Sequence, residues 1–177
     1  LTASSLNALA TTSTNPLSGS NSLQVSSPAA ITAGQGFIST AFTVDRKDYG
    51  KVLTFQVPYE VVSGGTNADW SGNSTQSMQV YIYDVTASAW IQPTGFRGMN
   101  QSSGAGVVSG TFQSSVTAGQ QYQIAVIAAN ATSGALTMNF DSIYVGPQTI
   151  PVGPAMTDTT AYTPTFSASY GTTTLQN

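Results

Sequence analysis

Alternation of apolar and polar residues with a period of two is the feature that most limits what this sequence can fold into. In segment 51–62 (KVLTFQVPYEVV) the apolar residues that share one face of an extended chain are Leu53, Phe55, Val57, Tyr59 and Val61. Side chains of a β-strand point alternately to its two faces, so this segment predicts a strand with one face on a hydrophobic core. Because Pro58 has no N–H to donate to a neighbouring strand, the strand either lies at a sheet edge or is bulged there.

The same alternation predicts three more strands, in segments 77–85, 120–129 and 136–145. In the third of these segments the apolar set changes phase after Phe140 and resumes at Ile143. A β-bulge near Asp141, which inserts one extra residue, would explain this shift. Weaker strand patterns lie at 22–26, 36–44, 89–92 and 107–113.

Turn sequences rich in Gly, Asn and Ser separate these segments, and no stretch shows a convincing helical period. About eight short strands with frequent turns predict an all-β chain that folds as an antiparallel β-sandwich. The most specific form of this prediction is a jelly roll, in which two facing sheets are built from Greek keys.

Changes in composition divide the chain into four predicted parts. They are an irregular N-terminal segment 1–19 (the end of a preceding part or a truncated first strand), a jelly-roll domain 20–147, a proline-containing linker 148–160 and the start of a following domain 161–177. The chain begins without methionine and without the basic residues of a signal peptide, so we interpret it as a piece of a longer polypeptide.

Composition excludes several kinds of chemistry. The chain has no cysteine and no histidine, which rules out disulfides, thiolate or imidazole metal ligands and a Ser-His-Asp triad. Four Lys and Arg residues in 177 are too few for binding nucleic acid through its phosphates. No apolar run approaches the roughly 18 residues of a membrane span, so membrane insertion is not expected.

A loop-like segment holds the first candidate binding site. In 64–77 (GGTNADWSGNSTQS), Trp70 has no apolar neighbours that would place it in a core pattern. Aromatic rings stack on the apolar faces of sugars, and the nearby groups that could pair with sugar hydroxyls are Asn67, Asp69, Asn73 and Gln76. The alternative is that Trp70 covers a sheet edge or lies in a subunit contact.

The second candidate site lies on a predicted strand. Tyr81 and Tyr83 share the face opposite Val80, so they form an aromatic ladder if that face is exposed and are packing residues if it is covered. Arg97, in a Gly-rich loop, is a candidate ligand contact, whereas core packing is favoured for Trp90.

No catalytic activity is expected. Glycoside hydrolysis usually needs two carboxyl groups roughly 5–10 Å apart. Glu60 and Asp84 could approach one another, but no other catalytic residue accompanies them. The glycine-rich motifs that hold nucleotide phosphates are also missing.

Two strings carry a family resemblance. VYIYDVTASAWIQP at 80–93, followed by GTFQSSVTAGQQYQIAVIAANATSGALTMNFDSIYVGPQ at 110–148, resembles the carbohydrate-binding-module-like jelly roll of bacteriophage tail fibres and tail spikes. AYTPTFSAS at 161–169 resembles the opening of another fibre domain. The match covers about 22–169, but the usual opening, an Asn-Pro-x-Phe-Glu-like segment with a following tryptophan, is missing.

The resemblance implies a function and partners. Asp141 matches the closing-strand acid of related modules, which makes it a candidate calcium ligand; otherwise it is a turn-forming residue, and no other cofactor is expected. The implied protein is a non-catalytic component of a phage tail appendage, and its implied partners are a host-surface glycan and other virion tail proteins. Such fibres are usually homotrimers.

Two alternatives stay open. The chain could be a carbohydrate-binding module of a secreted bacterial enzyme or surface protein, which would make it extracellular. It could instead be a purely structural decoration or spacer domain of a virion that binds no glycan.

Overall fold

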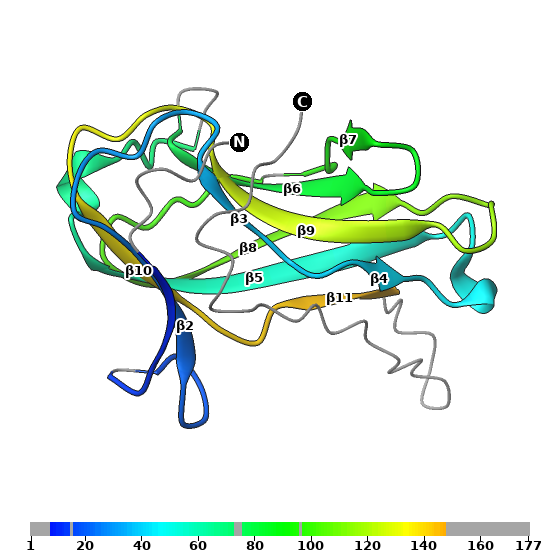
Figure 1. Cartoon of the computed structure of the whole chain (residues 1–177), viewed down its shortest axis with the longest axis horizontal. Helices are drawn as coiled ribbons and strands as arrows, with labels where there is room; N and C mark the ends of the chain where they lie inside the picture. The colour runs from blue at the N-terminus through cyan, green and yellow to red at the C-terminus, as the bar shows by residue number, and fades with distance from the viewer. Residues whose placement is uncertain (1–7, 15, 73–75, 96, 148–177) are drawn as a thin grey trace.

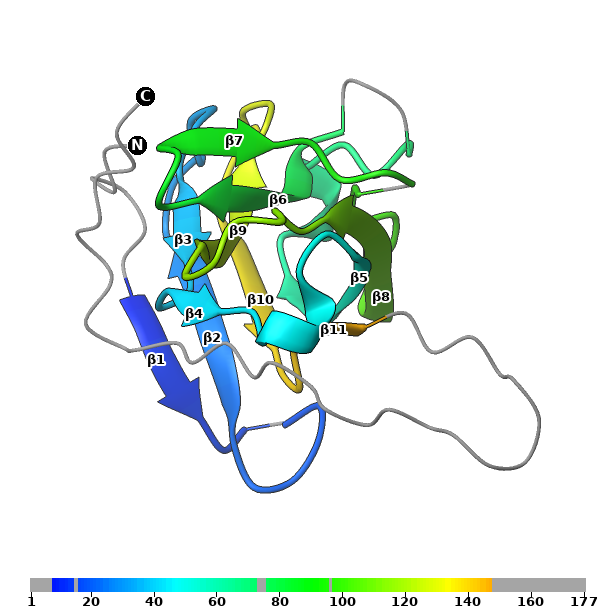
Figure 2. The same ribbon diagram turned by 90° about the vertical axis from the view of Figure 1, so that its right-hand side faces the viewer.

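The computed structural model describes residues 8–14, 16–72, 76–95 and 97–147, and they form two antiparallel β-sheets packed face to face (Figures 1 and 2). Sheet A contains β1 (Ala8–Thr12), β2 (Ser22–Ser27), β5 (Val52–Ser63), β8 (Gly104–Gln113), β10 (Leu136–Phe140) and β11 (Tyr144–Pro147). Sheet B contains β3 (Gly36–Ile38), β4 (Phe42–Thr43), β6 (Met78–Asp84), β7 (Ala89–Ile91) and β9 (Gln121–Ala128). Two short 3₁₀ turns, η1 (Arg46–Asp48) and η2 (Gly65–Asn67), lie in the connections.

The strand order is that of a jelly roll. In sheet A the order is β1-β2-β10-β5, with β8 on the other edge of β5 and β11 continuing along β5 beyond β10. In sheet B it is β3-β9-β6-β7, with β4 also beside β9. The chain crosses from one sheet to the other at six of the ten connections between these strands, and the connections β1–β2, β3–β4, β6–β7 and β10–β11 stay within a sheet. The predicted all-β jelly-roll sandwich is therefore confirmed.

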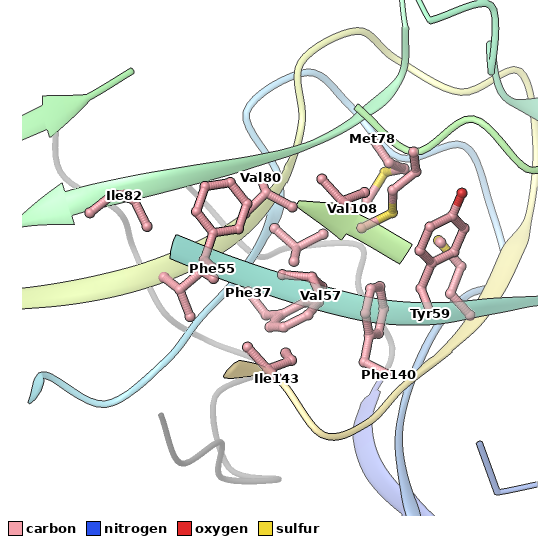
Figure 3. Close-up of a cluster of buried hydrophobic side chains, with 14 of the residues drawn as sticks. Phe37, Phe55, Val57, Tyr59, Met78, Val80, Ile82, Val108, Phe140 and Ile143 are labelled. Carbon is pink, nitrogen blue, oxygen red and sulfur yellow. The ribbon is translucent and has the colours of Figure 1, made fainter. Parts of the chain in front are cut away.

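The core fills the space between the sheets. All five apolar residues of the predicted face of segment 51–62 are at most 5% exposed. Figure 3 shows Phe55, Val57 and Tyr59 of β5 in one cluster with Met78, Val80 and Ile82 of β6. Alternation along β5 and β6 thus sets which side chains enter the core and which face outward.

The predicted bulge near Asp141 is present. Strand β5 pairs with β10 as far as Phe140 and with β11 from Tyr144, and the three residues 141–143 lie opposite only two residues of β5, one of which is Pro58. The Asp141 N–H donates to the Pro58 carbonyl (3.4 Å), but Pro58 has no N–H to return. Since β5 has neighbours on both sides, the edge alternative for this strand is wrong and the bulge alternative is right.

Only some of the predicted chain segments fall on residues that the structure describes. Strand β1 forms within the predicted segment 1–19 and pairs with β2. The linker 148–160 and the following part 161–177 lie outside the described residues. None of the described residues belongs to a helix that is long and apolar enough to cross a membrane.

Candidate functional site

A second, smaller apolar cluster lies on the outer face of sheet B, away from the core. Ile38, Ala125 and Ile127 are buried there beneath three partly exposed aromatic side chains, which we call the aromatic platform: Tyr81, Tyr83 and Trp90. The platform follows from alternation, because residues of β6 that flank inward-facing Val80 and Ile82 must face outward. Pairing of β7 with β6 sets Trp90 directly opposite Tyr83.

The rings of the platform hold one another in place. The Tyr83 and Trp90 ring centroids are 4.9 Å apart with planes inclined at 56°, and the Tyr81 and Trp90 centroids are 6.0 Å apart in an edge-to-face arrangement. Such contacts stabilise aromatic pairs and fix the rings before any ligand arrives. The platform is therefore a rigid, partly exposed aromatic surface.

Polar groups border the platform at Tyr81. The side-chain Oε1 of Gln79 accepts a hydrogen bond from the Tyr81 hydroxyl (2.9 Å) and another from Nε of Arg97 (3.0 Å). The guanidinium carbon of Arg97 lies 4.9 Å from the centroid of the Tyr81 ring, within the range of a cation–π contact. Further along the same face, Gln123 donates to the Ser39 carbonyl (2.7 Å).

The structure thus brings together Tyr81, Tyr83 and Arg97 from the sequence predictions and adds two residues. Trp90, for which core packing was favoured, packs on the outer cluster instead of the main core. In a hairpin closed by the four-residue loop 85–88, Asp84 pairs with Ala89 and Tyr83 with Trp90. The sequence could therefore have placed Trp90 on the same face as Tyr83. Alternation places Gln79 on the same face as Tyr81 and Tyr83, but its contact with Arg97, 18 residues away, left no signal in the sequence.

The loop that contains Trp70 lies elsewhere. Trp70 is partly buried against the main core cluster, and its indole Nε1 donates to the Gly65 carbonyl (2.6 Å). In the described part of the chain it makes no ring contact with the aromatic platform. The structure therefore does not join the two candidate sites.

The polar residues around Trp70 hold this loop together. Asn67 donates from Nδ2 to the Ala135 carbonyl (2.7 Å). The Asp69 carboxylate accepts the N–H of Ser71 (2.8 Å), which closes an Asx turn. Gln76 is fully buried and donates to the Met99 carbonyl. The fourth predicted neighbour, Asn73, lies outside the described residues.

Asp141 is the centre of a hydrogen-bond network at the bulge. Its Oδ2 accepts from the N–H and hydroxyl of Ser18 (both 3.0 Å) and from the hydroxyl of Ser22 (3.2 Å), and its Oδ1 accepts from the N–H of Ser142 (2.6 Å) and more weakly from its hydroxyl (3.3 Å). Burial by itself raises the pKa of Asp141, but these hydrogen bonds outweigh it, so the pKa lies below the ordinary value of 3.8. The network ties the turn before β2 to the closing strand.

This environment offers little to a calcium ion. Ca²⁺ takes six to eight oxygen ligands, usually with several carboxylates among them. Among the described residues there is no group of three or more Asp, Glu, His or Cys side chains that could hold a metal. Calcium at Asp141 stays a prediction for which the described residues supply a single carboxylate.

The structure does not bring Glu60 and Asp84 together, although the sequence left this possibility open. Glu60 faces outward from β5 in sheet A, whereas Asp84 is buried at the end of β6 in sheet B. The chain changes sheets between these two strands, which separates the two carboxyl groups. Asp84 instead accepts hydrogen bonds from the Ala87 N–H and the Gln120 side chain.

Comparisons with known proteins give matches only to solved structures. No family model matches the sequence, and no curated protein matches it significantly. The structure is similar to a family 16 carbohydrate-binding module (9% identity, 79% of this chain and 85% of the other, TM-score 0.47) and to a carbohydrate-binding module from Cellvibrio mixtus lichenase 5A in complex with cellotriose (10% identity, 80% and 95%, TM-score 0.41). A third similar structure is a family 35 carbohydrate-binding module from an environmental isolate (10% identity, 85% and 97%, TM-score 0.28).

Proposed function

We propose that this chain is a non-catalytic carbohydrate-binding domain and that it binds glycan on the outer face of sheet B. The observation that carries the proposal is the aromatic platform, bordered by the side chains of Gln79 and Arg97. Aromatic rings stack on the C–H faces of pyranose rings, while amide and guanidinium groups pair with hydroxyls and other polar substituents. Both kinds of group lie side by side here.

Preorganisation favours this surface over the Trp70 loop. On the platform, Tyr81 is held by Gln79 and by ring contacts, so ligand binding would not have to order it. Near Trp70, the Asn67 amide already donates to the Ala135 carbonyl and the Asp69 carboxylate already accepts the Ser71 N–H. The aromatic platform is therefore the surface on which we expect binding.

For the parent protein we propose a phage tail fibre or tail spike. The support is the resemblance of segments 80–93 and 110–148 to the fibre family, together with a chain that carries only 11 charged residues. In this setting the chain is part of a homotrimeric virion tail appendage, contacts other tail proteins and attaches the particle to host-surface glycan. A module of a secreted bacterial enzyme or surface protein would use the same platform.

The test is a glycan array probed with the wild-type chain and two matched tryptophan variants. Trp90→Leu keeps an apolar cover on the outer cluster but removes the flat ring, and Trp70→Leu makes the same change in the loop. We expect the wild type and Trp70→Leu to bind the same glycans and Trp90→Leu to lose them, with thermal unfolding confirming that each variant is folded. Binding that depends on Trp70 alone, or no binding by the wild type, would overturn the proposal.

A further inference from the structure

Arg97 has no counter-ion among the residues that the structure describes. The chain has only four Lys and Arg residues. Lys51 pairs with Asp48 at 3.2 Å, but Arg97 forms no ion pair with any carboxylate in the part of the chain that the structure describes. Its guanidinium is instead placed at the border of the aromatic platform, where the proposed ligand would lie.

The position of Arg97 is fixed by its backbone. The Arg97 carbonyl accepts the N–H of Val80 (2.8 Å), and two residues later the Met99 N–H donates to the Met78 carbonyl (3.0 Å). Residues 97–99 therefore run along one edge of β6 like a short additional strand. Strand β7 pairs with the same edge of β6 further along. Arg97 is thus part of the sheet framework, not a freely moving loop residue.

Its side chain is oriented as well. The Arg97 Nε donates to Oε1 of Gln79, and the same oxygen accepts a hydrogen bond from the Tyr81 hydroxyl. The Gln79 amide therefore orients both the guanidinium and the hydroxyl. Gln79 is itself only 5% exposed, and its Nε2 donates to the Gln76 carbonyl (3.3 Å). Among the described residues, Arg97 has no side-chain hydrogen-bond partner other than Gln79, which leaves the terminal Nη groups of the guanidinium for a ligand.

We propose that the ligand is an acidic glycan and that Arg97 binds the carboxylate of a uronic- or sialic-type sugar; this inference rests on the proposed function of the same surface. The planar fork of a guanidinium matches the two oxygens of a carboxylate, and such charge-assisted pairs are stronger than neutral hydrogen bonds. A neutral sugar would leave this preoriented cation without an ionic partner. Stacking on Trp90 and the two tyrosines holds the sugar rings, and Arg97 selects the charged unit.

The experiment compares acidic oligosaccharides with their own neutral forms. Trimers of galacturonic, glucuronic and mannuronic acid and two sialyllactoses are each measured beside the carboxyl-reduced counterpart, by calorimetry at low and at 0.5 M NaCl. Sulfated trisaccharides test whether a sulfate ester takes the same place. The variants are Arg97→Gln, which keeps polar N–H donors but not the charge, Arg97→Lys, and Trp90→Leu.

We expect the wild type to bind at least one acidic oligosaccharide roughly tenfold more tightly than its reduced form, because hydrogen bonds to charged groups are the stronger ones. The preference for the acidic form should shrink at high salt and disappear in Arg97→Gln. Arg97→Lys, which keeps the charge but not the planar fork, should retain only part of the wild-type preference. Trp90→Leu should weaken the acidic and neutral forms alike.

Three outcomes would contradict the inference, and they bear differently on the proposed function. If the wild type binds neutral forms as well as acidic ones and Trp90→Leu abolishes both, the acidic-glycan inference is wrong and the proposed function stands. Preference for sulfate over carboxylate also overturns the assignment to sugar carboxylates. If the wild type binds none of the oligosaccharides, the acidic-glycan inference fails, and the glycan array alone decides whether the proposed function fails with it.

Discussion

The hydrogen-bond network of Asp141 can be tested by changing it to asparagine. The carboxylate uses one oxygen for three hydrogen bonds from Ser18 and Ser22 and the other for two from Ser142. In Asp141→Asn one of these oxygens becomes an NH₂ group, which cannot accept, so either two or three hydrogen bonds are lost. At about 0.5–1 kcal/mol each in a partly exposed site, the free energy of unfolding should fall by about 1–3 kcal/mol at pH 7.

The pH dependence of this effect has a definite sign. The folded-state pKa of Asp141 lies below its ordinary value of 3.8, so the carboxylate stabilises the fold fully above that value and loses this contribution as the pH falls through the folded-state pKa. The difference in stability between the wild type and Asp141→Asn should therefore be constant from pH 7 to about pH 5 and shrink below pH 3.8.

Urea unfolding followed by circular dichroism measures both effects. The matched control is Glu60→Gln, because the Glu60 carboxylate forms no hydrogen bond among the described residues and the change removes the same charge. The control should shift the free energy of unfolding by less than about 0.5 kcal/mol. Equal stability of Asp141→Asn and the wild type at pH 7, or a difference that grows in acid, would refute the reasoning.

Three further changes test the core, the pairing of β3 with β9 and the border of the platform. Phe140→Ala removes a buried ring that packs edge-to-face on Phe37 (5.0 Å) and should lower the free energy of unfolding by about 3–5 kcal/mol in urea titration; a loss below about 1 kcal/mol would contradict the described core. A Cβ on Gly36 would overlap the Val126 carbonyl, so Gly36→Ala should lower the thermal midpoint sharply, whereas Gly119→Ser meets no atom within 4 Å and should lower it less, through the left-handed backbone at φ +76° alone. Gln79→Leu removes the amide that orients Arg97 and should weaken glycan binding about tenfold in calorimetry while thermal unfolding still shows a folded chain; unchanged affinity would show that Arg97 needs no such support.

The fold was predictable because its main signal is local. Alternation along 51–62 and 77–85 reports directly which side chains face the core, and the structure places them there. Even the interruption of the closing strand was readable, since a phase change after Phe140 requires an extra residue and Pro58 cannot support a continuous ladder.

The candidate site was only partly predictable, because it depends on contacts between distant segments. Tyr81 and Tyr83 could be assigned to one face of a strand, but whether that face lies open depends on the packing of the whole sheet. The link from Arg97 through Gln79 to Tyr81 exists only because residues 97–99 return to the edge of β6. Likewise, the ends of two successive strong strands could have brought Glu60 and Asp84 together, but β5 and β6 belong to different sheets.

The central claim is that glycan binds on the aromatic platform, and the two tryptophans allow a direct measurement. Each indole N–H gives its own signal in a ¹H–¹⁵N correlation spectrum, and Trp70→Leu and Trp90→Leu assign the pair. When the ligand identified on the array is titrated in, we predict that the Trp90 signal moves in a saturable way. The Trp70 signal, whose N–H is bonded to the Gly65 carbonyl, should stay in place. Movement of the Trp70 signal with a stationary Trp90 signal would contradict the account.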